Sequence, residues 1–430
     1  MFLTTKLANG VSLHIRQTTQ FKTISFSVKW RAPLTKEAAA HRTVLSNVLQ
    51  HSNERFQTAA RYRSYLDDLF GTILYFDTTK RGDQHTLLMN VDTVNDQYLA
   101  DSQVLNEVLK VMHTAIFKPN FKDGKFIESI VSREKEIIKQ RIESIFDDKS
   151  RYAYQRLLQI LRPNEPASIS AYGTTEAVEA ITPESLVKAY ESMLNNDEID
   201  IYLVGDVNIE EMTEKMKEIF PFKDREPIPT ITTTTNESKT AHTPKEYTKE
   251  QQEMKQGKLH IGYNTPVRFG DADFPKMQIF NGIFGGYAHS KLFMNVRERE
   301  SLAYYAGSSY SSHYGLIFVS SGIEPSNEKK AIDVIAEQLD AMRQGDITDL
   351  ELAQTKAMLI NQLKEALDSA RGQIEIFDQY NKLNEQFTVE TWTDRWQAVT
   401  KEDVQHMAEL VQLEAIYFLC GKEEANNENN

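Results

Sequence analysis

The sequence predicts an α+β protein with two similar domains in tandem, each an antiparallel or mixed β-sheet covered by helices. Three observations support this prediction. Strand-like and helix-like segments alternate, the second half of the chain repeats features of the first, and a proline- and threonine-rich stretch separates the halves. At 430 residues the chain is long enough to bury the cores of two or more domains.

The expected elements follow from hydrophobic periodicity and turn residues. Apolar alternation indicates strands, and apolar residues at helical spacing indicate amphipathic helices. We expect strands at 11–15, 23–30, 73–78, 86–91 and 200–205, helices at 36–50 and 59–70, and mainly helices from 95 to 161. Asn9-Gly10 marks a hairpin turn. Thr182 can cap a helix that begins with Pro183, and Thr348 to Glu351 form a capping box.

An internal repeat sets the domain boundaries. Ala180–Glu184 resembles Ala398–Glu402, and Ile201–Gly205 resembles Tyr417–Gly421, at offsets of 218 and 216 residues, which indicates a duplicated unit. Between these copies, prolines and a threonine run give an extended stretch with few core-forming residues. We therefore expect domains at 1–224 and 251–422, an interdomain linker at 225–250 and a disordered tail at 423–430.

Composition excludes several classes of partner. A net charge of −13 argues against nucleic acid or an anionic membrane as the main partner. Cys420 is the single cysteine, so an intrachain disulfide is excluded and a reducing compartment is favoured. The N-terminus lacks the pattern of a signal peptide, and no window reaches the length of a membrane span. We expect a cytoplasmic protein.

The stretch from Phe280 to Tyr305 carries the main chemical signal. It predicts a helix, a turn at Gly285-Gly286, a second helix, and a strand that begins near Leu302. Arg297 ends the second helix and Tyr304 lies where the strand begins, so a short loop can direct both side chains to one place. The plain alternative is that Arg297 pairs with a neighbouring glutamate and Tyr304 fills the core.

This stretch resembles the second domain of the pitrilysin/insulinase-like metallopeptidases, the M16 family that includes mitochondrial processing peptidase. The resemblance rests on Gly285-Gly286, on Ser290-Lys291-Leu292-Phe293, and on Arg297 followed seven residues later by Tyr304, and it extends over nearly the whole chain. It implies the LuxS/metallopeptidase-like fold. It also implies that Arg297 and Tyr304 hydrogen-bond the scissile carbonyl at a zinc site on another domain, with Gly285 and Gly286 beside the substrate.

The zinc ligands of that family are missing. Its signature, His-x-x-Glu-His on a first long helix, holds zinc through two histidines on one helix face, and a glutamate on a later helix completes the site. Here Thr43 to Asn47 occupy the signature position and offer neither imidazole nor carboxylate. Ser132 is expected at the later ligand position, with Glu134 as its alternative. His51 to Arg55 spells His-x-x-Glu-Arg, but arginine cannot ligate a metal, and we expect His51 to lie past the helix end. We expect no metal or cofactor in this chain.

Other reaction classes find no support. The sequence has no Gly-x-Ser-x-Gly elbow, no phosphate-binding loop and no dinucleotide fingerprint, and Cys420 lies in an apolar strand. The resemblance therefore implies the non-zinc subunit of a heterodimeric zinc endopeptidase for unstructured peptides. Such a chain is inactive alone and donates Arg297 and Tyr304 to a homologue with an intact His-x-x-Glu-His. A catalytically silent peptide-binding or scaffold protein, alone or as a homodimer, is the alternative. A metallopeptidase with an unrecognised site is a third hypothesis.

Overall fold

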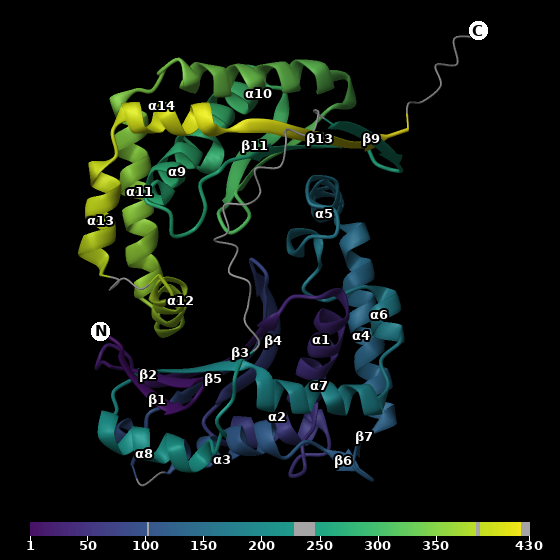
Figure 1. Ribbon diagram of the computed structural model, residues 1–430, viewed down its shortest axis with the longest axis vertical. Helices are drawn as coiled ribbons and strands as arrows, with labels where there is room; N and C mark the ends of the chain where they lie inside the picture. Colours follow the sequence, from purple (N-terminus) through teal and green to yellow (C-terminus); the bar gives the residue numbers. More distant parts are fainter. Residues whose placement is uncertain (101–102, 228–245, 384–387, 423–430) are drawn as a thin grey trace. The chain divides into compact units, whose positions relative to one another are not determined.

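The protein, described here by a computed structural model, forms two compact units (Figure 1). The structure describes residues 1–100, 103–227, 246–383 and 388–422. The first unit is Met1–Ser144, Ile169–Thr232 and Ala366–Lys382, and the second is Ile145–Ser168, Thr233–Glu365 and Leu383–Asn430. Each unit is a β-sheet with helices packed on it, which confirms the predicted α+β class. The predicted tail at 423–430 lies outside the described residues, as do residues 228–245 of the predicted linker.

The first unit contains a six-stranded sheet in the order β1-β2-β8-β3-β5-β4. Its strands are β1 (Leu3–Ala8), β2 (Val11–Gln17), β8 (Glu198–Gly205), β3 (Thr23–Pro33), β5 (Gln84–Val94) and β4 (Ile73–Arg81). Neighbours are antiparallel except β2 and β8, which run parallel. The predicted hairpin at Asn9-Gly10 is confirmed, because it joins β1 to β2 and Gly10 has the left-handed φ of +71° that such a turn requires.

The second unit contains a five-stranded sheet in the order β11-β12-β10-β13-β9. Its strands are β11 (Ala303–Ser311), β12 (Leu316–Ile323), β10 (Gly257–Asn264), β13 (Gln412–Gly421) and β9 (Glu246–Gln252). As β8 does in the first sheet, β13 lies between one parallel and one antiparallel neighbour. The two sheets therefore share one plan. The strand β9 begins inside the stretch that the sequence predicted as a linker.

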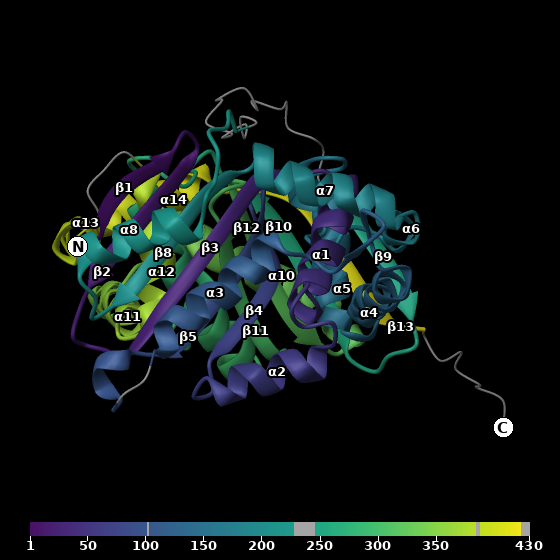
Figure 2. The ribbon, with the colours of Figure 1, turned by 90° about the horizontal axis from the view of Figure 1, so that it is seen from below.

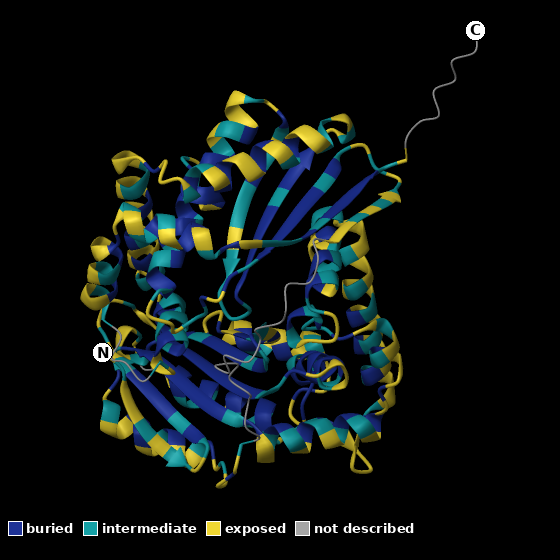
Figure 3. Cartoon of the chain, turned by 45° about the horizontal axis from the view of Figure 1, so that its top comes forward, coloured by how far each residue is buried: buried dark blue, intermediate teal, exposed yellow. Residues whose placement is uncertain are grey.

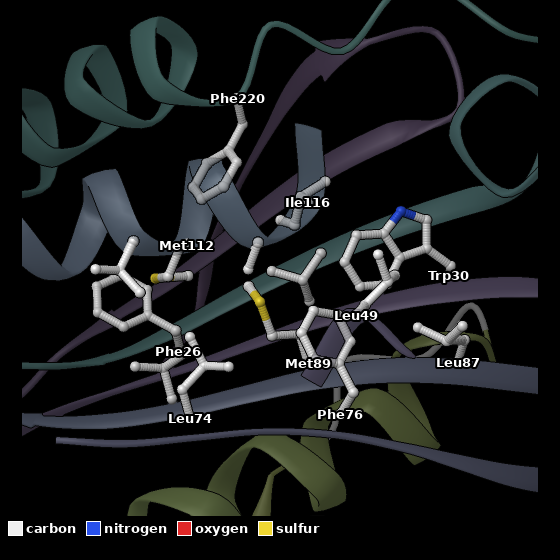
Figure 4. Close-up of a cluster of buried hydrophobic side chains, with 14 of the residues drawn as sticks. Phe26, Trp30, Leu49, Leu74, Phe76, Leu87, Met89, Met112, Ile116 and Phe220 are labelled. Carbon is white, nitrogen blue, oxygen red and sulfur yellow. The ribbon is translucent and has the colours of Figure 1, made fainter. Parts of the chain in front are cut away.

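One face of the first sheet packs on helices and forms the main core. The helices of this unit are α1 (Lys36–His51), α2 (Ala59–Asp68), α3 (Val104–Phe117), α4 (Glu128–Asp147), α6 (Thr175–Glu179), α7 (Pro183–Asn196) and α8 (Ile209–Ile219). The alternating residues Phe26 and Trp30 of β3 meet Met112 and Ile116 of α3 and Leu49 of α1 in this core (Figure 4). The helices α1, α3 and α8 cover this face (Figure 2), and the inner strands of both sheets are largely buried (Figure 3).

The opposite face of each sheet is covered by a helix from the other half of the chain. On the first sheet this helix is α12 (Ala370–Asn381), where Ala370 and Ile374 pack on Tyr202 and Val204 of β8. On the second sheet it is α5 (Lys149–Leu161), which packs on β10, β12 and β13. In Figure 1 the yellow-green α12 accordingly lies on purple and teal strands, and the blue α5 lies on green and yellow ones. The two halves exchange one helix each.

The remaining elements of the second unit surround its other sheet face. They are α9 (Phe274–Asn281), the π-helices η3 (Gly282–Gly286) and η4 (Leu292–Arg299), α10 (Glu328–Arg343), α11 (Asp349–Leu367), α13 (Val389–Ala398) and α14 (Lys401–Leu410). The predicted capping box at the start of α11 is confirmed: the Thr348 backbone N donates to Glu351 Oε2 at 2.8 Å, and the Glu351 backbone N donates to Thr348 Oγ1 at 3.1 Å.

The helices of the first unit differ from the prediction in one place and agree with it in another. The helical region predicted from 95 to 161 is interrupted by a short hairpin, β6 (Phe121–Lys122) with β7 (Lys125–Phe126), whose tight turn places Asp123 and Gly124 in the left-handed region. The predicted cap of α7 is confirmed, since Thr182 Oγ1 accepts from the backbone N of Ser185 at 3.1 Å. In the described part of the chain, every helix is too short or too polar to cross a membrane.

His260 is a buried histidine that links stability to pH. It lies on the face of β10 that α5 covers, is 3% exposed, and neither of its ring nitrogens has a hydrogen-bond partner among the described residues. Burial, with a smaller contribution from Lys258, lowers its pKa to about 4. Burial likewise lowers the pKa of His85 in the first unit, to about 3.

We expect the free energy of unfolding to fall as the pH is lowered from 6.5 towards 4. In that window the unfolded chain binds protons that the folded chain excludes, so each such histidine costs about 1.4 kcal/mol per pH unit. Urea denaturation at a series of pH values measures the slope. His260→Leu removes one titrating group and should make the slope shallower. The same change at His406, which is exposed on α14, serves as the control, and equal slopes in both variants would contradict the assignment.

Candidate functional site

The face of α1 that corresponds to the zinc signature is filled by hydrogen bonds within the chain. Thr43 is buried, and its Oγ1 donates to the carbonyl O of Ala171 at 3.0 Å and lies 3.0 Å from Thr78 Oγ1. The turn after Ser170 fits closely on α1, because a Cβ at Gly173 would lie 2.7 Å from the Cβ of Ala40. The hydroxyl at the first ligand position thus holds a backbone segment.

One turn further along α1, the second ligand position faces a buried carboxylate. Asn47 Nδ2 donates to Glu134 Oε2 at 3.5 Å, and His51 Nδ1 lies 3.1 Å from Glu134 Oε1. Arg133 also donates to Glu134 Oε1, through Nη2 at 2.7 Å. Burial raises the pKa of Glu134, but the hydrogen bonds from His51 and Arg133 outweigh it and leave the pKa below its usual value.

This geometry corrects two predictions. Ser132 is exposed and hydrogen-bonds Glu128 on its own helix, whereas Glu134 faces α1, so Glu134 is the counterpart of the later ligand. A step of two residues along a helix rotates the side-chain direction by about 200°. Ser132 and Glu134 therefore point to nearly opposite sides of α4, and only one of them can face α1. His51 is the last residue of α1 and does not lie past its end.

The residues at this face do not fit a zinc ion. Zinc requires three or four imidazole, thiolate or carboxylate ligands, and no group of three such residues in the described part of the chain is placed to hold a metal ion. The half-exposed guanidinium of Arg133 already compensates the charge of Glu134. A hydroxyl and an amide replace the two helix histidines, and both are engaged in hydrogen bonds.

The Gly285-Gly286 pair ends η3 where it meets the edge strand β11. A Cβ at Gly285 would lie 2.5 Å from the backbone N of Ser308, so only glycine permits this approach. Gly286 is exposed, and a Cβ there would lie 3.1 Å from the carbonyl O of Asn281. The packing explains Gly285 without a substrate, and the predicted substrate contact of both glycines stays a prediction.

Two hydrogen bonds and an ion pair join the loop between η3 and η4 to α11. Tyr287 OH donates to Gln362 Oε1 at 2.8 Å, and His289 Nε2 lies 2.8 Å from Thr355 Oγ1. Lys291 is buried and pairs with Glu351 at 3.0 Å. Alternate loop residues therefore each contact the same helix. Sequence analysis missed these anchors, although the capping box at Thr348 marked where α11 begins.

Arg297 lies in the last turn of η4 with its guanidinium at the surface, and the helix runs two residues past the predicted end, to Arg299. It stacks on the ring of Phe293, 4.6 Å from the ring centroid, and its Nε lies 3.7 Å from Glu298 Oε1. The neighbour that follows η4, Ser301, adopts a left-handed φ of +50°, and the backbone N of Leu302 donates to the carbonyl O of Val296 at 3.0 Å. This turn directs the chain from η4 into β11.

Tyr304 lies at the start of β11 and is 61% exposed, so it does not fill the core. Its hydroxyl donates to Glu324 Oε1 at 2.6 Å, and this hydrogen bond raises the pKa of the phenol. Arg297 and Tyr304 thus each contact a different neighbour, and among the described residues no hydrogen bond joins them directly. Both side chains are exposed, and the single hydroxyl proton of Tyr304 is donated to Glu324.

Comparisons with known proteins place the chain in a family. The model of the "Peptidase M16 inactive domain" matches residues 180–359. The chain is 39% identical over 418 residues to the "Probable inactive metalloprotease YmfF" of Bacillus subtilis, covering 97% of each chain. It is 20% identical over 402 residues to the "Antilisterial bacteriocin subtilosin biosynthesis protein AlbE" of Bacillus subtilis, covering 92% of this chain and 96% of that protein.

A solved structure agrees with these relatives. The crystal structure of a conserved protein from Enterococcus faecalis V583 superposes with a TM-score of 0.90 at 35% identity, and covers 99% of this chain and 100% of that one. Near-complete coverage by both kinds of comparison means that the likeness extends along nearly the whole chain, including α1 and the strand that carries Tyr304. The chain belongs to the peptidase M16 family.

Proposed function

We propose that this chain is the non-zinc-binding subunit of a heterodimeric M16 zinc endopeptidase that cleaves unstructured peptides in the cytoplasm. The observation that carries the proposal is an asymmetry. The face that would hold zinc is closed by the chain's own hydrogen bonds, whereas the side chains of Arg297 and Tyr304 are exposed. A zinc-bearing homologue with an intact His-x-x-Glu-His would supply the metal, and with it the activated water.

The role of Arg297 and Tyr304 in such a pair is electrostatic. A peptide carbonyl gains negative charge on its oxygen as it is attacked, and donors aimed at that oxygen stabilise the transition state by about 3 kcal/mol each. The phenol has one proton to donate, so Tyr304 must turn from Glu324 to the substrate. An exposed hydrogen bond contributes little net free energy, about 1 kcal/mol, and its exchange for a stronger one is favourable.

A second function, peptide binding without cleavage, is favoured by the edge of the first sheet. Among the strands that the structure describes, β4 pairs with β5 alone and lies at the edge of the sheet. Ile73, at the start of β4, is 56% exposed, and β4 packs beside α1. An extended peptide can add to such an edge through main-chain hydrogen bonds. A scaffold protein, alone or as a homodimer, would bind peptides at this edge, and Arg297 and Tyr304 would have no catalytic role.

The first prediction concerns activity in trans. Peptide cleavage should appear when this chain is mixed with the zinc-bearing homologue from the same genome and be absent from this chain alone. Arg297→Ala and Tyr304→Phe should each lower kcat/KM of the mixture by about 100-fold, because each removes one donor to the oxyanion. Cleavage of a fluorogenic peptide library measures the rates.

The matched control is Arg299→Ala. Arg299 lies on η4 as Arg297 does and likewise pairs with the glutamate that follows it, but we assign it no part in the site. It should leave the rate within a factor of about two. Equal losses in all three variants would indicate damage to η4 and contradict the proposed clamp. Peptide binding without turnover in every mixture would favour the scaffold function.

A second prediction tests the metal face. The triple variant Thr43→His, Ser46→Glu and Asn47→His should bind one zinc ion per chain, because its two histidines share a helix face with Glu134 opposite. Zinc content after dialysis against a weak chelator, measured by inductively coupled plasma mass spectrometry, gives the stoichiometry. Thr43→His alone brings a single imidazole to this part of the face and should bind none. A folded triple variant without zinc would refute Glu134 as the third-ligand counterpart.

A further inference from the structure

The contact between α12 and the first sheet is a buried network of charges. Arg31 of β3 lies at its centre, where its guanidinium contacts Asp200 of β8 and Asp378 of α12. Tyr202 OH donates to Asp378 Oδ1 at 2.6 Å, and Lys29 Nζ donates to Asp378 Oδ2 at 3.0 Å. All five residues are buried.

This network joins segments that lie far apart in the sequence. Burial raises the pKa of Asp378, but Arg31, Lys29 and Arg81 outweigh it and hold the pKa well below its usual range. The Asp378 carboxylate is therefore ionised in the folded protein at neutral pH. With α12 in place, loss of the Asp378 charge would leave Lys29 and Arg31 buried without one of their carboxylate partners, which is unfavourable. The cations on this sheet face require a helix that carries carboxylates, and α12 has two, at positions 375 and 378.

Residues at both ends of α12 also make polar contacts with the first sheet. At its start, Arg371 donates to the carbonyl O of Phe26 at 2.7 Å and pairs with Asp92 at 2.8 Å. Just past its end, Lys382 pairs with Glu198 at 3.0 Å. These contacts fix the position of the helix along the strands as well as its identity.

The reciprocal contact, between α5 and the second sheet, is mainly apolar. Its buried cluster consists of Ala153, Leu157, Leu158, Leu161, Ala167, Leu316, Phe318, Ala415, Tyr417 and Leu419. A Cβ at Gly262 would lie 2.5 Å from Leu161 Cδ1, so the glycine makes room for the helix. At the rim, Tyr152 and Tyr417 both donate to Glu250, each at 2.7 Å.

We propose that the two halves of the chain clasp each other through these exchanged helices, so that a chain cut between residues 228 and 245 remains a single particle. The N-terminal fragment carries α5, which the second sheet needs, and the C-terminal fragment carries α12, which the first sheet needs. The charge network around Arg31 makes the clasp specific, and the apolar face of α5 adds an extended buried surface. The clasp does not depend on the proposed enzymatic function.

The test uses the full-length protein with a specific protease site inserted between residues 228 and 245. After complete cleavage, size-exclusion chromatography under native conditions should give one peak at the position of the uncut chain. An affinity tag on the N-terminal fragment should retain the C-terminal fragment in equal amount. Separation of the fragments into two species would overturn the proposal.

The role of the charges is tested in the same cleaved protein. Asp378→Asn keeps the shape of the side chain but removes its charge, and should weaken association of the fragments by at least about tenfold. Glu375→Gln, at the half-exposed edge of the network, is a milder change with a smaller effect in the same direction. Fluorescence titration of labelled fragments in dilute urea measures the dissociation constants.

The control is Asp333→Asn, which removes an exposed carboxylate that pairs with Lys329 on α10. It should leave the dissociation constant unchanged. Since Asp378→Asn could prevent folding before cleavage, Glu375→Gln keeps the test decisive. Hydrogen exchange in the uncut chain gives a second readout, where Glu375→Gln should speed exchange of the amides of 370–381 but not of 149–161. Variants indistinguishable from Asp333→Asn in both measurements would contradict the role of the network.

Discussion

Each sheet of this protein is closed on one face by a helix that the other half of the chain supplies. This constraint governs the rest of the structure. The strands β3 and β8 carry Arg31, Asp200 and Tyr202 on the face that α12 covers, where a core would normally be apolar. These polar residues contact Asp378 of α12 or each other. Because α5 must cross to the second sheet, β10 carries Gly262 beneath it. Neither half completes its own sheet.

Within the first unit, the metal face of the family has become a hydrogen-bonded face. The helix α1 presents Thr43 and Asn47 one turn apart, and α4 presents the buried carboxylate of Glu134 to Asn47. The side chains now bind a backbone carbonyl and that carboxylate, and Arg133 neutralises the charge that a metal would have neutralised. The packing around this face is therefore held by hydrogen bonds within the chain.

Much of this could be predicted from the sequence, because it depends on local signals. The alternation in β3, the periodicity of α1, and the caps at Thr182 and Thr348 each act within a few residues. The exchange of α5 and α12 could not be predicted, since it depends on contacts between residues hundreds of positions apart. Lys29 and Arg31 in an alternating strand indicate a solvated face, and the helix that buries them gives no local sign.

At the candidate site the missed features have similar causes. The π-helical geometry of η3 and η4 has no distinct residue preference, so the sequence predicts ordinary helices there. Glu324, which holds the Tyr304 hydroxyl, comes from the end of a neighbouring strand and carries no motif. The identities of Arg297 and Tyr304 came from resemblance, and their exposure came from the structure.

The central claim is that the metal belongs to another chain while this chain brings the donors. Native mass spectrometry of this chain, of its zinc-bearing homologue and of the mixture tests it most directly, because it counts chains and ions in the same particle. The account predicts a complex of the two unlike chains with one zinc ion, and no zinc on this chain alone. One zinc ion bound stoichiometrically to this chain by itself would contradict it.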